Sequence, residues 1–319
     1  MLGRVANTIY WMNRYLERAE NYARFMDVNY NLSLDLPPNE EQQWKPLVMI
    51  TGDWKLYESL NSKVEKSKVI YFLGFDEQNP NSIYNCITNA RENARAIRPE
   101  ITKEVWEQIN ALYYLVKNGL EKKRYKDKDL RPFFTEIKNG CQLLYGMYDA
   151  TISRNEGWNF AKLGQAIERA DKTSRVLDAK YHFLLESSNQ VGSSLDLIQW
   201  AALLKSVSAY DMYRKKYGKL TASTIAEFLI LDTQFPRSIL ACLIRVERSL
   251  ITLSGSSVRF SNDAQKQLGA LKSQLEYTDI NDIIAKGMHD YLDDIQRKLN
   301  GISSAIYESF FSIENHLTN

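Results

Sequence analysis

A short charged motif occurs twice in this chain of 319 residues, and the repeat strongly limits what the chain can fold into. Glu17-Arg18-Ala19-Glu20 recurs as Glu168-Arg169-Ala170-Asp171, at an offset of 151 residues. Apolar residues around both copies are spaced three and four apart, which is the period of one face of an α-helix. Both copies are therefore predicted to lie on long, equivalent helices. Two further charged pairs match at the same offset: Arg24 with Arg175, and Asp27 with Asp178.

A second block repeats further along each half. Eight residues between Phe72 and Cys86 are identical, in register, to residues between Phe228 and Cys242, at an offset of 156. So long a repeat indicates duplication of a whole unit, because solenoids repeat at much shorter periods. No Gly/Ser/Pro-rich linker separates the halves near 153–157, which favours one shared core. The prediction is an all-α helical bundle of about twelve helices. It would form a single domain over 1–319, built from two tandem pseudo-symmetric six-helix units of about 1–155 and 156–319.

Few residues interrupt the helical pattern, because glycine and proline are scarce. The first helix is expected over Leu2–Leu34 and ends before Pro37-Pro38. Asn79-Pro80-Asn81-Ser82 is typical of a helix N-terminus. No segment shows sustained alternation at period two, which predicts no sheet. The other helices are expected over Glu41–Ile50, Asp53–Asn61, Lys66–Phe75, Ser82 to near Arg98, Thr102–Asn118, Arg131–Ile152, Gly157–Leu185, Leu195–Tyr217, Ser223–Leu231, Pro236–Leu253, Asn262–Leu275 and Ile280–Ile313.

Charge and hydropathy exclude several classes of protein. The formal net charge is +2, so no strong field attracts nucleic acid or an anionic membrane. The densest basic stretch, Lys117–Arg131, is interrupted by acidic residues and is interpreted as a solvated connection. No run of about 18 apolar residues could span a bilayer, and residues 1–20 lack the apolar core of a signal peptide. We therefore expect a cytoplasmic protein with no membrane and no nucleic-acid partner.

Known catalytic and metal-binding motifs are missing. The three cysteines are far apart in sequence and show no C-x-x-C spacing, which argues for a reducing compartment and against a disulfide framework or a zinc site. The three histidines form no H-E-x-x-H or E-x-x-H pair, and there is no Walker or Rossmann glycine loop. The chain is therefore not expected to bind ATP through a known loop. No metal and no cofactor are expected, with Mg²⁺ held by paired acids as the weaker alternative.

The repeated motif is the first candidate site. Glu17, Glu20, Arg24 and Asp27 step by three and four residues, so they project from one face of the first helix. The same charges recur in the second half at all four positions, although an exposed face drifts readily after duplication. Partners that hold both copies would explain this match. Two interpretations stay open: a buried ion-pair network at the interface of the halves, or a ligand site.

A second polar cluster, Arg91-Glu92-Asn93-Ala94-Arg95 with Arg98, lies in the first half alone. On a helix its three arginines share one face, and guanidinium groups can hold carboxylate or phosphate bidentately. The equivalent stretch after Glu247 does not keep the pattern, which hints at a specialised role in the first half. The alternative is that these arginines form ion pairs with Glu17 and Glu20.

At these residues the chain resembles the bacterial alpha-E domain family. Nearly the whole chain takes part in the resemblance, and it departs only at Asn13, where small residues such as glycine are usual. The segments that carry it are Tyr10-Trp11-Met12-x-Arg14-Tyr15-Leu16-Glu17-Arg18-Ala19-Glu20-x-x-Ala23-Arg24, Asn79-Pro80-x-Ser82-Ile83, Ala90-Arg91-Glu92-Asn93-Ala94-Arg95, Glu104-x-Trp106-x-x-x-Asn110, Gly164-x-x-x-Glu168-Arg169-Ala170-Asp171 and Phe235-Pro236-Arg237-Ser238.

The resemblance implies an all-helical fold, a poorly defined biochemical role and a particular context. Alpha-E proteins are typically encoded beside, or fused to, circularly permuted ATP-grasp proteins, often with transglutaminase-like peptidases nearby. The first hypothesis is therefore an accessory, substrate-handling partner of an ATP-grasp amide ligase that makes or modifies a peptide or amide-linked metabolite. Its substrate would be a peptide or a small carboxylate or amine.

Two further hypotheses remain. The chain is either an enzyme in its own right, with Glu17 or Glu168 as general acid/base after burial raises its pKa, or a purely structural interaction module. The sequence leaves the reaction and the oligomeric state open. The residues expected to bind ligand are Arg14, Glu17, Arg18, Glu20, Arg24, Arg91, Glu92, Asn93, Arg95, Arg98, Glu168, Arg169, Asp171, Arg175 and Arg237.

Overall fold

A computed structural model describes residues 1–35, 40–183, 193–255 and 261–312. Within these ranges the chain contains fifteen α-helices and no strand, so the prediction of an all-α fold is confirmed. Short 3₁₀ turns lie at Arg98–Glu100 (η1) and Arg124–Lys126 (η2), and a π-helical turn at Tyr307–Phe311 (η4). The helices are α1 (Gly3–Asp35), α2 (Glu40–Thr51), α3 (Trp54–Leu60), α4 (Lys66–Gly74), α5 (Ile83–Ala96), α6 (Lys103–Glu121), α7 (Arg131–Thr151), α8 (Glu156–Phe183), α9 (Ser194–Ser206), α10 (Tyr210–Tyr217), α11 (Ala222–Leu231), α12 (Ile239–Ser254), α13 (Asp263–Glu276), α14 (Ile280–Lys286) and α15 (Met288–Ile306).

The described residues hold more helices than the predicted twelve or so, in part because two segments expected to be continuous are broken. The segment Leu195–Tyr217 divides into α9 and α10, and Ser208 between them has a φ of 53°. The segment from Ile280 divides into α14 and α15 at Gly287, whose φ is 96°. A positive φ cannot continue a right-handed α-helix, so each helix must end there.

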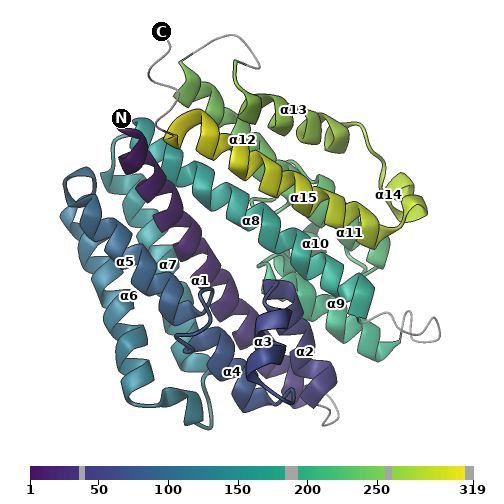
Figure 1. The fold of residues 1–319 in the computed structure, drawn as a ribbon. Helices are drawn as coiled ribbons and strands as arrows, with labels where there is room; N and C mark the ends of the chain where they lie inside the picture. The colour runs from purple at the N-terminus through teal and green to yellow at the C-terminus, as the bar shows by residue number, and fades with distance from the viewer. Residues whose placement is uncertain (36–39, 184–192, 256–260, 313–319) are drawn as a thin grey trace.

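The two long helices that carry the repeated motif, α1 and α8, lie side by side through the middle of the molecule (Figure 1). Helices α5 and α7 pack on α1, and α6 packs on both of them. Helices α12 and α15 pack on α8, and α13 packs on both of these. In addition, α2 contacts α8 and α9 contacts α1. Because neighbours surround α1 and α8, their charged side chains face protein on most sides.

The crossing of α1 and α8 is close at Gly164. A Cβ added to this glycine would lie 2.4 Å from the backbone oxygen of Tyr10 on α1. Only a residue without a side chain lets the two backbones approach to this degree. This close approach fixes the position of α8 relative to α1 one helical turn before Glu168.

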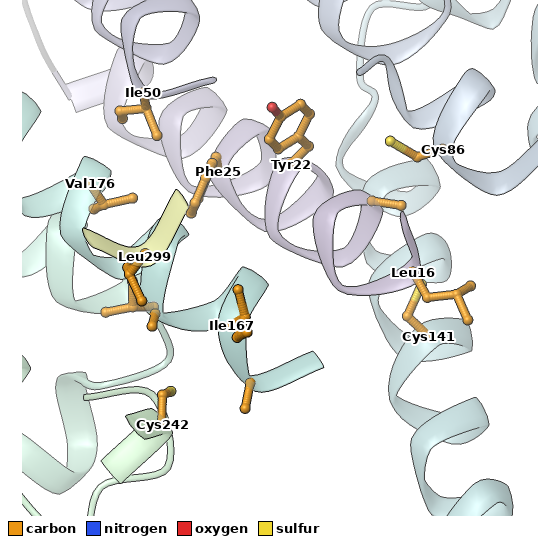
Figure 2. Packing of buried hydrophobic residues seen from close by; sticks show 14 of the residues in the cluster. Leu16, Tyr22, Phe25, Ile50, Cys86, Cys141, Ile167, Val176, Cys242 and Leu299 are labelled. Carbon is orange, nitrogen blue, oxygen red and sulfur yellow. The ribbon is translucent and has the colours of Figure 1, made fainter. Parts of the chain in front are cut away.

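Apolar side chains from both halves of the chain form the core around these helices. Figure 2 shows Tyr22 of α1 on the side of Cys86, Leu16 of α1 beside Cys141, and Cys242 on the opposite side of the view, below Ile167 of α8. All three cysteines are buried and free of disulfides. Burial raises the pKa of Cys86 to about 12 and that of Cys242 to about 11, so both thiols stay protonated at neutral pH.

Candidate functional site

Glu17 on α1 is fully buried and is held by two arginines from the second half of the chain. Arg169 of α8 donates from Nε to Oε1 at 2.9 Å and from Nη2 to Oε2 at 2.8 Å. Arg237 donates from Nη1 to Oε1 at 2.9 Å and from Nη2 to Glu20 Oε2 at 2.8 Å. The Asn21 amide also donates to Glu17. A bidentate arginine pair with further donors is the arrangement that makes a buried carboxylate tolerable.

Glu168 on α8 is equally buried and is held by cations from α1. Arg18 donates from Nε to Oε1 at 2.7 Å and from Nη2 to Oε2 at 3.1 Å. Arg14 donates from Nε to Oε2 at 2.9 Å. The ammonium group of Lys172, one turn along α8, lies 3.5 Å from Oε1. The two Glu-Arg pairs therefore bind each other reciprocally, the glutamate of each helix to the arginine of the other.

The second acid of each motif extends the network. Glu20 pairs with Arg24 on its own helix as well as with Arg237. Asp171 accepts from Arg175 Nε at 2.9 Å and from Lys172 Nζ at 3.0 Å. The structure thus brings ten of the predicted site residues into one network around the interface of α1 and α8, eight of them buried and Arg18 and Arg175 partly buried, which favours the ion-pair network over an open ligand site. They are Arg14, Glu17, Arg18, Glu20, Arg24, Glu168, Arg169, Asp171, Arg175 and Arg237.

Arg237 reaches Glu17 because a short loop before α12 is held in place by its own polar side chains. The Asp232 carboxylate accepts hydrogen bonds from the backbone amides of Gln234 at 2.8 Å and Phe235 at 2.6 Å. Ser238 then caps α12. Thr173 of α8 donates from its hydroxyl to the Arg237 carbonyl at 2.8 Å, which ties the loop to α8. These contacts fix the backbone at Arg237, which places its guanidinium group beside Glu17.

The electrostatics of the network keep the carboxyl groups of Glu17 and Glu168 ionised. Burial by itself would raise the pKa of Glu17, but Arg169 and Arg237 outweigh burial and lower that pKa to about 2. Burial is likewise the largest influence on Glu168, and Arg18, Lys172 and Arg14 together hold its pKa well below the usual range. General acid/base catalysis at neutral pH needs a carboxyl pKa raised toward 7. The shifts at Glu17 and Glu168 go in the opposite direction.

Four partners in the network were missed from the sequence: Asn21, Asn81, Gln142 and Lys172. Asn81 accepts from Arg18 Nη1 and donates from Nδ2 to Asp53 Oδ1 at 2.8 Å. Its position after Pro80 indicated only the start of a helix. Lys172 lies four residues after Glu168, a spacing typical of helical ion pairs, and that spacing could have found it.

The second polar cluster, Arg91-Glu92-Asn93-Ala94-Arg95 with Arg98, is called the α5 cluster here and lies outside this network. Arg91 donates from Nε to Asn110 Oδ1 at 2.7 Å and from Nη1 to Glu92 at 2.8 Å. Arg95 is exposed and pairs with Glu92 at 3.4 Å, and Arg98 donates from Nη1 to the Ile101 carbonyl at 3.1 Å. Asn93 lies beside these residues on α5, half-buried. The alternative in which these arginines pair with Glu17 and Glu20 is therefore wrong, since Arg169, Arg237 and Arg24 occupy those carboxylates.

Within the ranges that the structure describes, no group of three or more His, Cys, Asp or Glu side chains is placed to hold a metal ion. No helix in those ranges is long and apolar enough to cross a membrane.

The fold and the network define an all-helical protein whose two central helices are joined by reciprocal, buried Glu-Arg pairs. The model of the Alpha-E family, described as a predicted α-helical domain with a conserved ER motif, matches residues 1–311. The chain belongs to this family. Glu17-Arg18 and Glu168-Arg169 are Glu-Arg pairs of the kind the description names, and both lie in the interface of α1 and α8.

Similar curated proteins are themselves uncharacterized. One is from Mycobacterium bovis and two are from strains of Mycobacterium tuberculosis, and each is 24% identical to this chain over 271 residues. The alignment covers 80% of this chain but 30% of each relative. The chain therefore spans less than a third of the length of these relatives. No solved structure matches the chain.

Proposed function

We propose that this chain is a non-catalytic helical partner that handles substrate for an ATP-grasp amide ligase acting on a peptide or an amide-linked metabolite. One observation carries this proposal: Glu17 and Glu168 are fully buried and clamped by arginines, which hold their pKa values below the ordinary range. Carboxylates in that state stabilise a helix interface and are poor proton carriers at neutral pH. A role as a binding and positioning module fits them better than a role in catalysis.

The length of the relatives supports a partner. In the mycobacterial proteins, sequence that matches this chain makes up 30% of a much longer polypeptide. We therefore expect this chain to work together with a module that resembles the remainder of those relatives, in the same polypeptide or in another. A transglutaminase-like peptidase would be a further member of the same system.

The α5 cluster is the surface proposed to hold the substrate's carboxylate or phosphate. Arg91 lies over the ring of Tyr113, with 4.4 Å from its guanidinium carbon to the ring centroid. Arg91 and Arg98 both lie 5.8 Å from the ring of Trp106. The rings orient the guanidinium groups, and three arginines against the single carboxylate of Glu92 leave this cluster with a net positive charge that favours an anion. Arg95 is the most exposed of the three, and its side chain is 70% accessible.

We also propose that the chain is one domain of two pseudo-symmetric units, about 1–155 and 156–319. The helices α2, α3, α4 and α5 correspond by an offset of 156 to α9, α10, α11 and α12. That offset pairs Trp44 with Trp200, and each is 1% exposed. It also pairs Tyr57 with Tyr213, whose hydroxyls donate to the carbonyls of Lys63 and Lys219 at 3.0 and 2.7 Å. Matched contacts of this kind support descent of both units from one ancestor.

The test is a pull-down of the tagged chain from native lysate, with captured proteins identified by mass spectrometry. Recovery of an ATP-grasp protein is expected. Its product formation should rise when the chain is added, and Arg95→Glu/Arg98→Glu should abolish that rise. Arg214→Glu/Lys215→Glu, the same charge change on exposed residues of α10, should leave it intact. The proposal fails if no ligase is captured, or if the ligase is fully active without this chain.

The enzyme hypothesis has a separate test. If Glu17 were a general acid/base, Glu17→Gln would abolish product formation in the purified chain while leaving its thermal stability unchanged. We expect the reverse: Glu17→Gln should lower the Tm strongly, and the isolated wild-type chain should show no turnover. Turnover by the chain alone, lost in Glu17→Gln at an unchanged Tm, would replace the accessory role with a catalytic one.

A further inference from the structure

A cavity of about 620 Å³ lies beyond Arg24 of the network along α1, where the start of α4 meets the turn η2 and the side chain of Tyr30. Helix α4 stands at the opposite end of α1 from the chain's N-terminus (Figure 1). The volume is within the range of about 300–1,000 Å³ that is usual for small-molecule sites. The lining includes Lys66, Lys68, Lys126, Lys128, Glu65, Asp127, Tyr30, Tyr71 and Tyr125.

Cationic side chains dominate the polar lining, because lysines outnumber acids by four to two. Both acids already have cationic partners: Glu65 pairs with Lys68 of the lining at 2.8 Å, and Asp127 pairs with Arg124, outside the lining, at 3.2 Å. Across the described residues, neither Lys126 nor Lys128 forms a salt bridge with a carboxylate. The cavity is therefore electrostatically suited to an anion. It also gives a role to the basic stretch Lys117–Arg131, which the sequence indicated was only a solvated connection.

The backbone at the start of α4 adds to the positive potential of the cavity. Helix α4 begins at Lys66, its N-cap residue Glu65 makes no side-chain cap hydrogen bond, and its first turn contains no acid. The first amides of a helix point outward and carry partial positive charge, so an uncapped N-terminus favours an anion beside it. The lining of the cavity includes Lys66, Ser67 and Lys68, the first three residues of α4.

Aromatic rings supply a wall for a carbon skeleton. Tyr71 and Tyr125 meet edge to face with their centroids 4.9 Å apart, and Tyr125 also packs against Phe75. The Tyr30 hydroxyl donates to the carbonyl of Lys128, which fixes the backbone that carries the exposed lysines. The lining therefore combines lysines with aromatic rings, the two parts that a small organic anion requires.

We propose that this cavity binds a small phosphate monoester, with the phosphate at the start of α4 between Lys126 and Lys128 and the carbon skeleton against Tyr71 and Tyr125. The inference is independent of the ligase partnership, because it uses none of the residues assigned to that role. A phosphate is favoured over a carboxylate because a tetrahedral dianion can accept from the α4 amides and from lysines on two segments at once.

The probe for the first test is phenyl phosphate, titrated into ¹⁵N-labelled full-length chain. Saturable shifts of the Ser67 and Lys68 amides are expected, together with shifts at Tyr125. Phenol should not bind, and inorganic phosphate should bind more weakly, because each probe has only one of the two parts. The proposal is overturned if phenyl phosphate leaves the α4 amides unmoved, or if phenol shifts them to the same extent.

The variant test uses the same probe and calorimetry. Lys126→Gln/Lys128→Gln removes two exposed charges and should raise the Kd for phenyl phosphate about tenfold or more, as expected for lost charge-assisted hydrogen bonds. Lys122→Gln/Lys123→Gln makes the same change on the same connection but outside the lining, and should change the Kd less than about twofold. An equal loss in both variants would mean general attraction to a basic stretch and would overturn the site.

Discussion

Glu17 and Glu168 are buried equally well, but different residues neutralise them. The offsets of the repeat pair Arg18 with Arg169, and these two arginines make the reciprocal bidentate contacts. Apart from Arg14, which gives Glu168 a further guanidinium donor, the remaining donors are exchanged. At Glu17 the loop supplies Arg237 and the helix supplies the amide of Asn21, one turn later.

At Glu168 the arrangement is reversed. The position matched with Arg237 is Asn81, which meets Arg18 with an amide, and the position matched with Asn21 is Lys172, which supplies the cation from the helix. In both centres a buried carboxylate is neutralised, but the cation beside the shared arginine comes from a loop in one centre and from a helix in the other. A buried acid tolerates several donor sets but requires one of them.

The largest expected effect comes from removing either charge. Glu17→Gln and Glu168→Gln should each lower the free energy of unfolding by about 3–5 kcal/mol, because each leaves buried arginines without a counter-charge. Glu92→Gln, on the exposed α5 cluster, should cost less than about 1 kcal/mol. Urea unfolding followed by circular dichroism measures all three. A loss at Glu17 or Glu168 as small as at Glu92 would mean that the network does not hold the interface together.

Lowering the pH should weaken the same centres without mutation. The folded-state pKa of Glu17 is about 2, below its ordinary value of 4.5, so its stabilising contribution is present above pH 4.5 and is lost as the pH falls toward 2. Glu168, with its pKa also well below the usual range, acts in the same direction. In unfolding measurements between pH 6 and 3, the wild type should lose stability more steeply than Glu17→Gln, which lacks one of these groups. Parallel curves for the two proteins would contradict this.

An exchange of donors tests the comparison directly. Arg237→Asn should destabilise the Glu17 centre, because it reproduces the amide found at Asn81 without a compensating cation. Adding Asn21→Lys would reproduce Lys172 and should restore at least about 1 kcal/mol, a coupling of the size seen between contacting residues. Asn21→Lys alone should not stabilise the protein. If the double variant is no more stable than Arg237→Asn, the two donor sets are not interchangeable.

The sequence predicts this architecture well but not the partners within it. Helical periodicity and the repeat are local signals, so the all-α class and the long motif helices could be read directly. Which buried cation meets which carboxylate depends on how α1 crosses α8, and the sequence does not encode that crossing in any short pattern.

The α5 arginines show the same limit. Ile83, Cys86, Ile87, Ala90 and Ala94 form the buried face of α5, and this face directs Arg91 and Arg95 away from α1. Their proximity to Glu17 was a reasonable hypothesis from composition, and packing excludes it. Glycine at position 287 is a sequence signal for the break between α14 and α15, whereas Ser208 gave no sequence signal for the break between α9 and α10.

A smaller effect is expected where the backbones of α1 and α8 meet. Gly164→Ala should cost about 1–3 kcal/mol, because its methyl group would overlap the Tyr10 backbone oxygen and force the helices apart. Gly146→Ala on α7 is the matched control, since a Cβ there meets nothing within 4 Å. It should stabilise the chain by up to about 1 kcal/mol through helix propensity. Thermal unfolding of both variants measures the difference, and a neutral Gly164→Ala would show that the crossing can relax.

The smallest effect we expect is a difference in pH dependence between one ion pair in the first half and its matched ion pair in the second half. Asp27 on α1 pairs with Lys138 at 3.3 Å, and its matched residue Asp178 on α8 pairs with His289 Nδ1 at 2.6 Å. The hydrogen bond with Asp178 raises the pKa of His289 above 6.5, so this contribution is complete below pH 6.5 and is lost as the pH rises through the folded-state pKa. Asp178→Asn should therefore cost up to about 1 kcal/mol at pH 6 and less at pH 8.5. Asp27→Asn should cost the same at both pH values, because lysine stays charged across this range. Equal pH dependence in the two variants would mean that His289 does not carry the charge that ties α15 to α8.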